Sequence, residues 1–378
     1  MQYRKFGNTG MNVSTLGFGC MRLPMHEING KRVVDKDKSN EMIKKAYELG
    51  VNYFDTAFFY CDQDSEVAVG QGVKAFRDKI YVATKIPLGD EVQKASDYRA
   101  MLEKQLKKLD MDYIDCYHFW GINKGGFDDK ILRLDLLSEA RKAKEEGLIK
   151  HISFSYHGNP DDLPYIIEKA EVLESMLIQY NLLDRSNEKG IEYAASKGLG
   201  VVAMGPVGGG RLAAPADLYQ KVSGKESTST YELALRFVLG NPNISCALSG
   251  MQKMSEVENN AAVMSSNEPF TEAENKKIIQ QMEDLKKFSD LYCTGCRYCM
   301  PCVSDIDIPH LFYMYTMYNV YGLTDLAKDM YRRYNKERTD KNKGGFVKDC
   351  IECGACETKC PQSIEIREKL KLVHETLS

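Results

Sequence analysis

The stretch Gly50-Val51-Asn52-Tyr53-Phe54-Asp55-Thr56-Ala57 joins a predicted helix to a predicted buried strand. The segment directly before it, Ser39–Leu49, carries apolar side chains at helical spacing, and a glycine at this point is typical of a helix C-cap. The short apolar run that follows is typical of a parallel strand that is buried on both faces. This junction therefore indicates an α/β fold.

The same alternation of strand and helix continues along most of the chain. Eight strands, each followed by a helix over about 250 residues, are typical of a (β/α)8 TIM barrel. A doubly wound sheet is the competing fold, and it is disfavoured because no Gly-x-Gly-x-x-Gly follows the first strand. The opening segment, Gln2–Asn12, predicts a hairpin that closes the bottom of the barrel. The predicted strands are Ser14–Cys20, Tyr53–Ala57, Ile80–Lys85, Tyr113–Trp120, Ile149–Tyr156, Met176–Asn181, Gly200–Pro206 and Ile244–Met251.

Eight of the twelve cysteines lie in two runs near the end of the chain. The second run has the spacing Cys-x2-Cys-x2-Cys-x3-Cys followed by Pro361, which bacterial ferredoxins use to bind a 4Fe–4S cluster. The first run departs from this pattern, since it is one residue short before Cys302 and Val303 stands where proline is expected. The first run is Cys293, Cys296, Cys299 and Cys302, and the second run is Cys350, Cys353, Cys356 and Cys360.

Zinc binding and disulfide formation are both less favoured roles for these cysteines. Structural zinc sites prefer two separated Cys-x2-Cys pairs rather than three cysteines at successive x2 spacing. Disulfides require an oxidising compartment, and the opening residues, Met1–Lys5, do not resemble a secretory signal. The runs therefore predict two 4Fe–4S clusters. Because the fourth cysteine of such a run usually binds the other cluster, we assign one cluster to Cys293, Cys296, Cys299 and Cys360, and the other to Cys350, Cys353, Cys356 and Cys302.

The chain has two predicted domains. A barrel is expected over residues 1–288, and a mainly α-helical ferredoxin-like domain with two clusters is expected over residues 289–378. A helix is expected over Glu272–Asp290, further helices over Ile308–Tyr334, and a solvated loop over Asn335–Lys343. The four remaining cysteines are expected to be small buried side chains.

The composition excludes several classes of partner. The 378 residues carry a formal net charge of −3, and the basic residues are spread along the chain, so there is no electrostatic footprint for nucleic acid. No apolar stretch approaches the roughly 20 residues of a membrane-spanning helix. We therefore expect a cytoplasmic protein that binds neither nucleic acid nor a membrane.

Polar residues follow three consecutive predicted strands of the barrel. Asp55 ends the second strand and Tyr60 lies in the loop after it, while Lys85 ends the third strand and His118 lies near the end of the fourth. Because active sites of TIM barrels form at the carboxyl ends of the strands, these side chains are expected to converge. Metal-dependent hydrolysis is rejected, since the chain has only six histidines and His118 cannot build such a site alone.

These residues resemble those of the aldo-keto reductase superfamily. The matching pieces are Gly50–Ala57, Tyr60 with Ser65-Glu66, Thr84-Lys85, and Asp112-Tyr113-Ile114-Asp115 with His118. With the cysteine tail included, the chain resembles the ferredoxin-fused, iron–sulfur branch. The resemblance implies hydride transfer between a nicotinamide and a carbonyl or alcohol substrate. It also implies four roles: Tyr60 donates the proton, Lys85 lowers the pKa of Tyr60, Asp55 holds Lys85, and His118 orients the carbonyl oxygen.

The resemblance also implies a nicotinamide site over the ends of the strands. Three departures bear on it: Met204 replaces the usual stacking aromatic ring, Tyr156 replaces a common asparagine, and Glu256 stands where NADP-preferring members often carry arginine. The carboxylate of Glu256 argues against a preference for NADP, with Lys253 or Gln252 as possible compensation. The implied cofactor-binding residues are Gly19, Cys20, Met21, Ser155, Gln179, Met204, Gly205, Pro206, Val207, Gly209, Arg211, Gly250, Gln252 and Asn260.

Several functional alternatives remain open at the level of sequence. A nicotinamide passes two electrons as hydride, whereas a cubane cluster passes one, so the clusters suggest a flavin mediator, a ferredoxin-like electron partner or a purely structural role. The chain could also be an electron-transfer or docking protein whose barrel is mainly a scaffold. That alternative predicts no binding of NAD or NADP and no effect of changing Tyr60.

Overall fold

The computed structural model describes residues 1–182, 184–208, 229–266, 270–285, 291, 293–319, 324–341 and 343–378. The chain divides into two compact units. One comprises Met1–Val207 and Tyr231–Glu272, and the other comprises Gly208–Thr230 and Ala273–Ser378. Within these described ranges, no helix is both long enough and apolar enough to cross a membrane.

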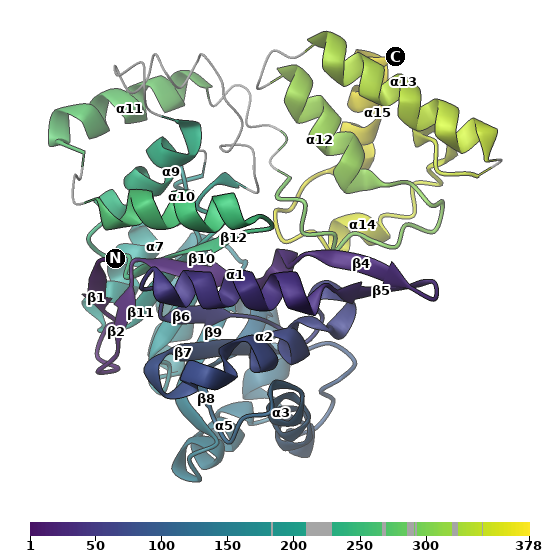
Figure 1. The fold of residues 1–378 in the computed structure, drawn as a ribbon. Helices are drawn as coiled ribbons and strands as arrows, with labels where there is room; N and C mark the ends of the chain where they lie inside the picture. Colours follow the sequence, from purple (N-terminus) through teal and green to yellow (C-terminus); the bar gives the residue numbers. More distant parts are fainter. Residues whose placement is uncertain are drawn as a thin grey trace. The chain divides into compact units, whose positions relative to one another are not determined.

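The first unit contains a closed barrel of eight strands, which confirms the TIM-barrel prediction (Figure 1). Neighbouring strands follow the order β10–β11–β12–β3–β6–β7–β8–β9, and every neighbouring pair is parallel. Their carboxyl ends therefore meet at one mouth. The strands are β3 (Leu16–Gly19), β6 (Tyr53–Asp55), β7 (Tyr81–Ile86), β8 (Ile114–Ile122), β9 (Ile149–Tyr156), β10 (Ser175–Gln179), β11 (Gly200–Met204) and β12 (Cys246–Gly250).

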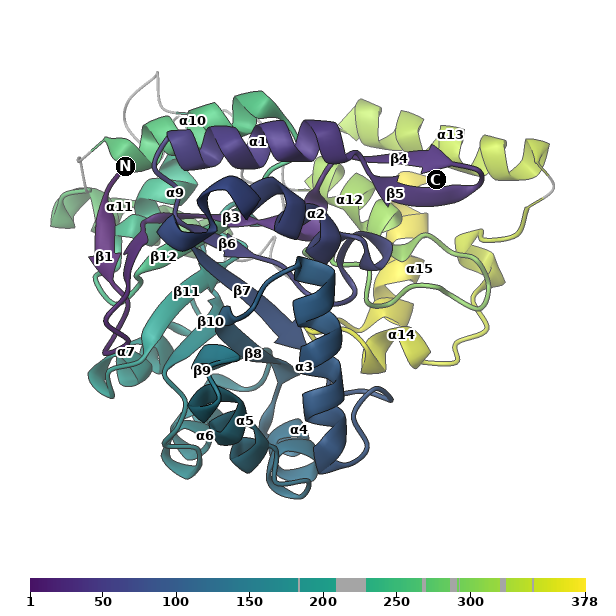
Figure 2. The ribbon, with the colours of Figure 1, turned by 60° about the horizontal axis from the view of Figure 1, so that its bottom comes forward.

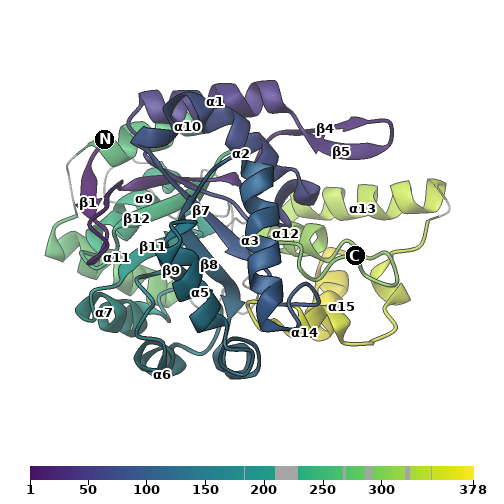
Figure 3. The same cartoon turned by 90° about the horizontal axis from the view of Figure 1, so that it is seen from below.

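Helices lie outside the strands, as Figures 2 and 3 show for α1, α2, α3 and α5. Each longer helix buries one apolar stripe; α1, for example, buries Met42, Ile43 and Ala46. This is the amphipathic pattern from which the helices were predicted. The helices of this unit are α1 (Lys36–Glu48), α2 (Ser65–Val73), α3 (Ala95–Leu109), α4 (Lys124–Gly126), α5 (Leu136–Glu145), α6 (Leu163–Lys169), α7 (Glu188–Ser196), α9 (Thr230–Gly240) and α10 (Met254–Ser265).

An N-terminal hairpin closes the bottom of the barrel, as predicted. Strands β1 (Tyr3–Lys5) and β2 (Asn12–Ser14) pair antiparallel. Phe6, Met11 and Val13 belong to one apolar cluster with side chains of β6, β7, β8, β10, β11 and β12. The Arg4 guanidinium donates hydrogen bonds to the carbonyls of Leu239, Asn241 and Ile244. The hairpin is therefore fixed both by apolar packing and by hydrogen bonds.

Two local features differ from the sequence predictions. The predicted first strand, Ser14–Cys20, is divided, because Ser14 belongs to β2 of the hairpin and β3 begins at Leu16. A second hairpin, formed by β4 (Met25–Ile28) and β5 (Lys31–Val34), was not predicted. Its turn residues, Asn29 and Gly30, have φ values of 51° and 75°. An Asn-Gly turn of this kind is a recognised hairpin signal.

The second unit is mainly helical, as predicted. Its apolar core includes Leu311, Phe312, Tyr331 and Leu370, and several cysteines pack against it. Helix α13 continues to Asp340, so the loop predicted from Asn335 was wrong over this part. The last five positions predicted for the helix that begins at Glu272 lie outside the described residues. The helices are α11 (Glu272–Leu285), α12 (Ile308–Asn319), α13 (Thr324–Asp340), α14 (Ala355–Thr358) and α15 (Ile366–Leu377).

Candidate active site and cysteine pockets

The register of the strands places three polar side chains inside the mouth of the barrel. Successive residues of a strand point to opposite faces, so residues two apart share a face. Tyr53, Ala83 and Cys116 belong to the apolar cluster inside the barrel. The residues two positions further along the same strands are Asp55 of β6, Lys85 of β7 and His118 of β8. The predicted convergence of these three side chains is therefore a direct consequence of the fold.

Asp55 and Lys85 form a buried ion pair. Lys85 Nζ donates hydrogen bonds to Asp55 Oδ1 at 2.5 Å and to the Thr56 carbonyl at 2.7 Å. Both side chains are about 1% exposed. Burial raises the pKa of Asp55 and lowers the pKa of Lys85, whereas the charge of each partner opposes both shifts. The buried carboxylate of Asp55 thus holds the Lys85 ammonium at the mouth of the barrel.

Tyr60 lies at the start of the turn that follows β6. Lys85 Nζ is 4.8 Å from the centroid of its ring, and the Trp120 ring contacts the Tyr60 ring edge-on, with the centroids 5.5 Å apart. The next three residues, Cys61–Gln63, have φ values of 50°, 54° and 72°. Non-glycine residues rarely adopt this left-handed region, and it costs about 1–2 kcal/mol per residue. The strained turn brings Tyr60 back over the end of β7.

Cys61 fixes this turn against the end of β3. Its Sγ donates to the carbonyls of Cys20 and Met21, at 3.6 and 3.5 Å. Ser65 Oγ, at the start of α2, donates to the same Cys20 carbonyl at 2.8 Å. Two residues that follow Tyr60 are therefore bonded to the segment after β3.

His118 is fully buried beside the ion pair. Its Nε2 lies 3.8 Å from Asp55 Oδ2. Burial and the positive charge of Lys85 lower the pKa of His118 to about 3, so the imidazole is neutral at physiological pH. Neither ring nitrogen has a hydrogen-bond partner in the described part of the chain. A neutral imidazole in this position can orient a substrate oxygen but cannot serve as a ready source of protons.

A second polar network lies between β7, the strand of Lys85, and the helices α2 and α3. Glu66 Oε1 accepts hydrogen bonds from Thr84 Oγ1 and Gln105 Nε2, and Lys108 Nζ lies 2.8 Å from Glu66 Oε2. Gln105 Nε2 also donates to the Lys85 carbonyl at 3.0 Å. The sequence pattern does not reveal this role of Gln105, because its position on the buried face of α3 looks like any other until α3 packs on β7.

Part of the predicted nicotinamide site lies on the opposite arc of the mouth. Ser155 of β9 accepts a hydrogen bond from the Gly121 N–H at 2.7 Å. Gln179 of β10 is 5% exposed, and Met204 pairs with it at the end of β11. Gly205 has φ +64°, and a Cβ there would come within 2.8 Å of Gln179 Oε1. Only glycine therefore lets the chain pass so close to this amide.

The other predicted cofactor residues lie at the junction of β12 and β3. Gly19 and Gly250 pair across these strands, with Cys20 and Met21 directly after Gly19. Asn260 of α10 is buried and donates to Ser249 Oγ. Pro206 and Val207 follow Gly205, whereas Gly209 and Arg211 lie outside the described residues.

Glu256 is already engaged at the start of α10. Its Oε2 accepts hydrogen bonds from the backbone N–H groups of Gln252 and Lys253, at 2.7 and 3.3 Å. These are helix N-terminal donors of the kind that can hold a phosphate. The carboxylate therefore occupies these donors and adds a negative charge beside them.

Tyr156 and the histidine that follows it differ in how they relate to the mouth of the barrel. The Tyr156 hydroxyl donates to the Asn159 carbonyl at 2.5 Å, so this hydroxyl is bonded within the loop after β9. His157 lies on the same strand face as Ser155. Burial and the charge of Lys85 lower the pKa of His157 to about 4. This histidine was not among the predicted site residues, although counting along β9 in steps of two from Ser153 leads to it.

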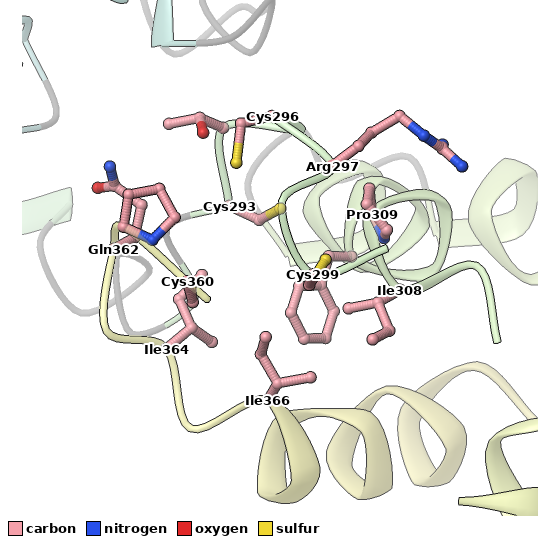
Figure 4. Close-up of a pocket in the computed structure, with 13 residues that line it drawn as sticks. Cys293, Cys296, Arg297, Cys299, Ile308, Pro309, Cys360, Gln362, Ile364 and Ile366 are labelled. Atoms are coloured by element: carbon pink, nitrogen blue, oxygen red, sulfur yellow. The ribbon is translucent and has the colours of Figure 1, made fainter. Parts of the chain in front are cut away.

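In the second unit, four cysteines surround one pocket (Figure 4). They are Cys293, Cys296 and Cys299 of the first run and Cys360 of the second run, and the rest of the lining includes Ile308, Phe312 and Ile366. Burial and the charges of the other three sulfurs raise the pKa of Cys299. These are the four residues that the spacing assigned to one cluster.

A second pocket contains the remaining four cysteines. Cys302, Cys350, Cys353 and Cys356 line it, together with Cys299 at its edge. The charge of Cys302 acts on Cys356, so Cys302 lies close to the second run in spite of its shortened spacing. Both pockets therefore combine residues from the two cysteine runs.

The chemistry of the first pocket fits a multinuclear metal centre. Burial, together with repulsion from Cys293, Cys296 and Cys360, raises the pKa of Cys299 to about 12. Four thiolates can lie this close in an apolar pocket only when positive charge compensates them. Among the described residues, no group of three or more Cys, His, Asp or Glu side chains is arranged to hold a single metal ion.

Comparisons with known proteins identify two regions of the chain, the barrel and the cysteine-rich part. A family model described as "Aldo/keto reductase family" matches residues 15–283. A second model, described as "4Fe-4S dicluster domain", matches residues 292–365.

Individual relatives match about three-quarters of the chain. L-galactose dehydrogenase from Arabidopsis thaliana is 30% identical over 319 residues, which cover 75% of this chain and 96% of the plant protein. The structure of aldo-keto reductase AKR11C1 from Bacillus halodurans is 26% identical, with a TM-score of 0.64, and the match covers 74% of this chain and 96% of that one. The structure of the thermostable aldo-keto reductase Tm1743, at 23% identity and a TM-score of 0.62, covers 74% of this chain and 100% of that one and supports the fold.

Proposed function

Because the chain belongs to the aldo/keto reductase family and carries a 4Fe-4S dicluster domain, we propose that it is a cytoplasmic NAD(P)-dependent reductase that interconverts a carbonyl compound and an alcohol. Tyr60 is its proton donor, and the clusters of residues 289–378 exchange electrons with a ferredoxin-like partner. The proposed boundary near residue 288 is supported by the two family matches, of which one ends at residue 283 and the other begins at residue 292.

One observation supports the proposal above all others: the Lys85 ammonium lies 4.8 Å from the centroid of the Tyr60 ring and is bonded to buried Asp55. A free phenol has a pKa near 10 and is a poor acid at neutral pH. A cation beside the ring stabilises the phenolate that remains after the proton leaves, so Tyr60 can protonate an alkoxide. Neutral His118 donates a hydrogen bond that orients the carbonyl oxygen.

A bound nicotinamide would supply or accept the hydride, since no other two-electron donor is implied by the barrel. Ser155 and Gln179 would hold its carboxamide, and Asn260 would face the adenine side. Met204 replaces a stacking ring with a flexible apolar side chain, which can still cover one face of the nicotinamide. Glu256 favours NADH over NADPH because its charge repels a 2′-phosphate.

The decisive variant is Tyr60→Phe, tested in anaerobically purified holoenzyme. Loss of the proton donor is expected to lower kcat/KM for aldehyde reduction by about 100-fold to 10,000-fold, with cluster absorbance unchanged. Tyr156→Phe is the matched control, since its hydroxyl bonds to the Asn159 carbonyl, and it should retain activity within about twofold. Undiminished activity of Tyr60→Phe would show that another group donates the proton.

The role of the clusters needs a separate experiment. NADH and NADPH are added to the holoenzyme without oxygen, while cluster absorbance and the EPR spectrum are followed together. We expect a nicotinamide to bind without bleaching the clusters, because hydride transfer moves two electrons and a cubane accepts one. A reduced ferredoxin is then expected to reduce them.

The alternatives give different results in the same titration. Bleaching by a nicotinamide alone would require a mediator, and a flavin should then be found in the protein. Clusters that neither a nicotinamide nor ferredoxin reduces would be structural. Failure to bind any nicotinamide, together with full function of Tyr60→Phe, would leave the barrel as a scaffold for electron transfer.

A further inference from the structure

His157 faces the mouth of the barrel from the end of β9. Ser153 Oγ and Ser175 Oγ lie 2.5 Å apart beside Cys116, which is inside the barrel. Since residues two apart along a strand share a face, Ser155 and then His157 follow Ser153 toward the mouth. The His157 backbone N–H donates to the Ile122 carbonyl at 3.0 Å, which continues the pairing of β9 with β8 and fixes the histidine at the rim.

Aromatic side chains form the neighbouring part of this rim. Trp120 shares a strand face with His118 and contacts the rings of Tyr60 and Phe59, with centroids 5.5 and 5.7 Å away. Gly121 has φ +65° at a register shift of β8, and a Cβ on it would lie 3.9 Å from His157 Cδ2. The His157 imidazole therefore lies beside Gly121, the residue directly after the tryptophan whose ring contacts Tyr60.

The imidazole of His157 is available for a ligand. Its side chain makes no hydrogen bond or ion pair with the residues that the structure describes, and it is partly exposed, unlike His118. Burial and Lys85 lower its pKa to about 4, so it is neutral at pH 7. A neutral imidazole has one donor nitrogen and one acceptor nitrogen. This combination suits a hydroxyl group, which can both accept and donate, better than a carboxylate.

We propose that His157 is a specificity-determining residue, which binds a hydroxyl group close to the reacting carbonyl and so selects hydroxy-carbonyl substrates and their polyol products. This inference rests on the proposed function, because it places the reacting carbonyl at Tyr60. Trp120 covers the carbon chain of the same substrate, and His157 forms a hydrogen bond with its hydroxyl group.

The test compares hydroxyacetone with acetone, which differ by one hydroxyl group. The wild-type holoenzyme should prefer hydroxyacetone by about tenfold or more in kcat/KM, since a site built to bond a hydroxyl rejects an analogue that lacks it. His157→Phe should remove this preference mainly by raising KM for hydroxyacetone, with acetone changed less than about threefold. His157→Gln, which keeps one donor and one acceptor, should restore part of it, and Tyr156→Phe should leave it unchanged.

Binding provides a readout that does not need turnover. Trp120 is the only tryptophan of the chain, so its fluorescence can report the binding of hydroxyacetone or acetone with NAD+ or NADP+ present. A preference for hydroxyacetone that His157→Phe removes supports the inference, even when the protein turns neither compound over; in that case the proposed reductase activity is what fails. An equal affinity for both compounds, or a preference that survives in His157→Phe, overturns the inference.

Discussion

The barrel site and the cysteine pockets hold their functional side chains by different means. Asp55, Lys85 and His118 belong to neighbouring barrel strands that pair with one another through their backbones. In the second unit all the cluster cysteines except Cys356 lie outside helices and strands. The barrel site is therefore preorganised by the fold, whereas the cysteine segments, under the proposed cluster assignment, would depend on the metal that joins them.

The largest expected effect comes from removing one cluster ligand. Cys299→Ser should lower the iron content from about eight to about four per chain, since each cluster holds four irons, and should expose residues 289–378 to proteolysis. Trp120 fluorescence should still report a folded barrel. Cys246→Ser is the control, because this thiol lies inside the barrel. Full iron content in Cys299→Ser would contradict the assignment.

The buried ion pair tests the preorganised side of the comparison. Lys85→Met leaves Asp55 buried without its partner, which should cost about 3–5 kcal/mol of barrel stability. Urea unfolding followed by Trp120 fluorescence measures this loss. The double variant Asp55→Asn/Lys85→Met should recover much of it, because no buried charge remains. A single variant as stable as the wild type would mean that water reaches the carboxylate.

The pH dependence of barrel stability comes next in size. His118 has a pKa of about 3 in the folded protein and about 6.5 in an unfolded chain. Between these values the unfolded state binds more protons, so stability falls as the pH is lowered from about 6.5 toward 3. The slope should approach about 1.4 kcal/mol per pH unit. His118→Gln should reduce the slope by this amount in urea titrations at pH 6, 5 and 4, and equal slopes would rule out this contribution.

The smallest effect concerns the choice of nicotinamide. Glu256→Ala removes a charge and frees the N–H groups of Gln252 and Lys253. The ratio of kcat/KM for NADPH to that for NADH should rise several-fold, which corresponds to about 1 kcal/mol of binding free energy. Steady-state kinetics with both nicotinamides measures the ratio. Glu258→Ala, in the same helix, should leave it unchanged.

Sequence patterns predicted most of the fold. Asp55, Lys85 and His118 lie on neighbouring strands as expected, and their catalytic roles stay predictions. Short apolar runs between helical segments located all eight barrel strands, and cysteine spacing predicted a dicluster domain that the family comparison supports. Two kinds of feature were missed. Gln105 acts through a contact that exists only after α3 packs on β7, and the inward direction of His157 depends on the register of β9. The extension of α13 was hidden by its charged composition.

Shared ligands also set an order for biosynthesis. Under the proposed assignment, the Cys293 pocket is completed by Cys360, and the Cys350 pocket by Cys302. A ribosome that has passed the first cysteine run has therefore produced three ligands of one cluster and one ligand of the other. Neither cluster can have all four ligands until the later cysteines of the second run emerge, so completion of the clusters follows the synthesis of the whole barrel. A premature stop before Cys360 would deprive the earlier run of its fourth ligand while leaving the barrel sequence intact.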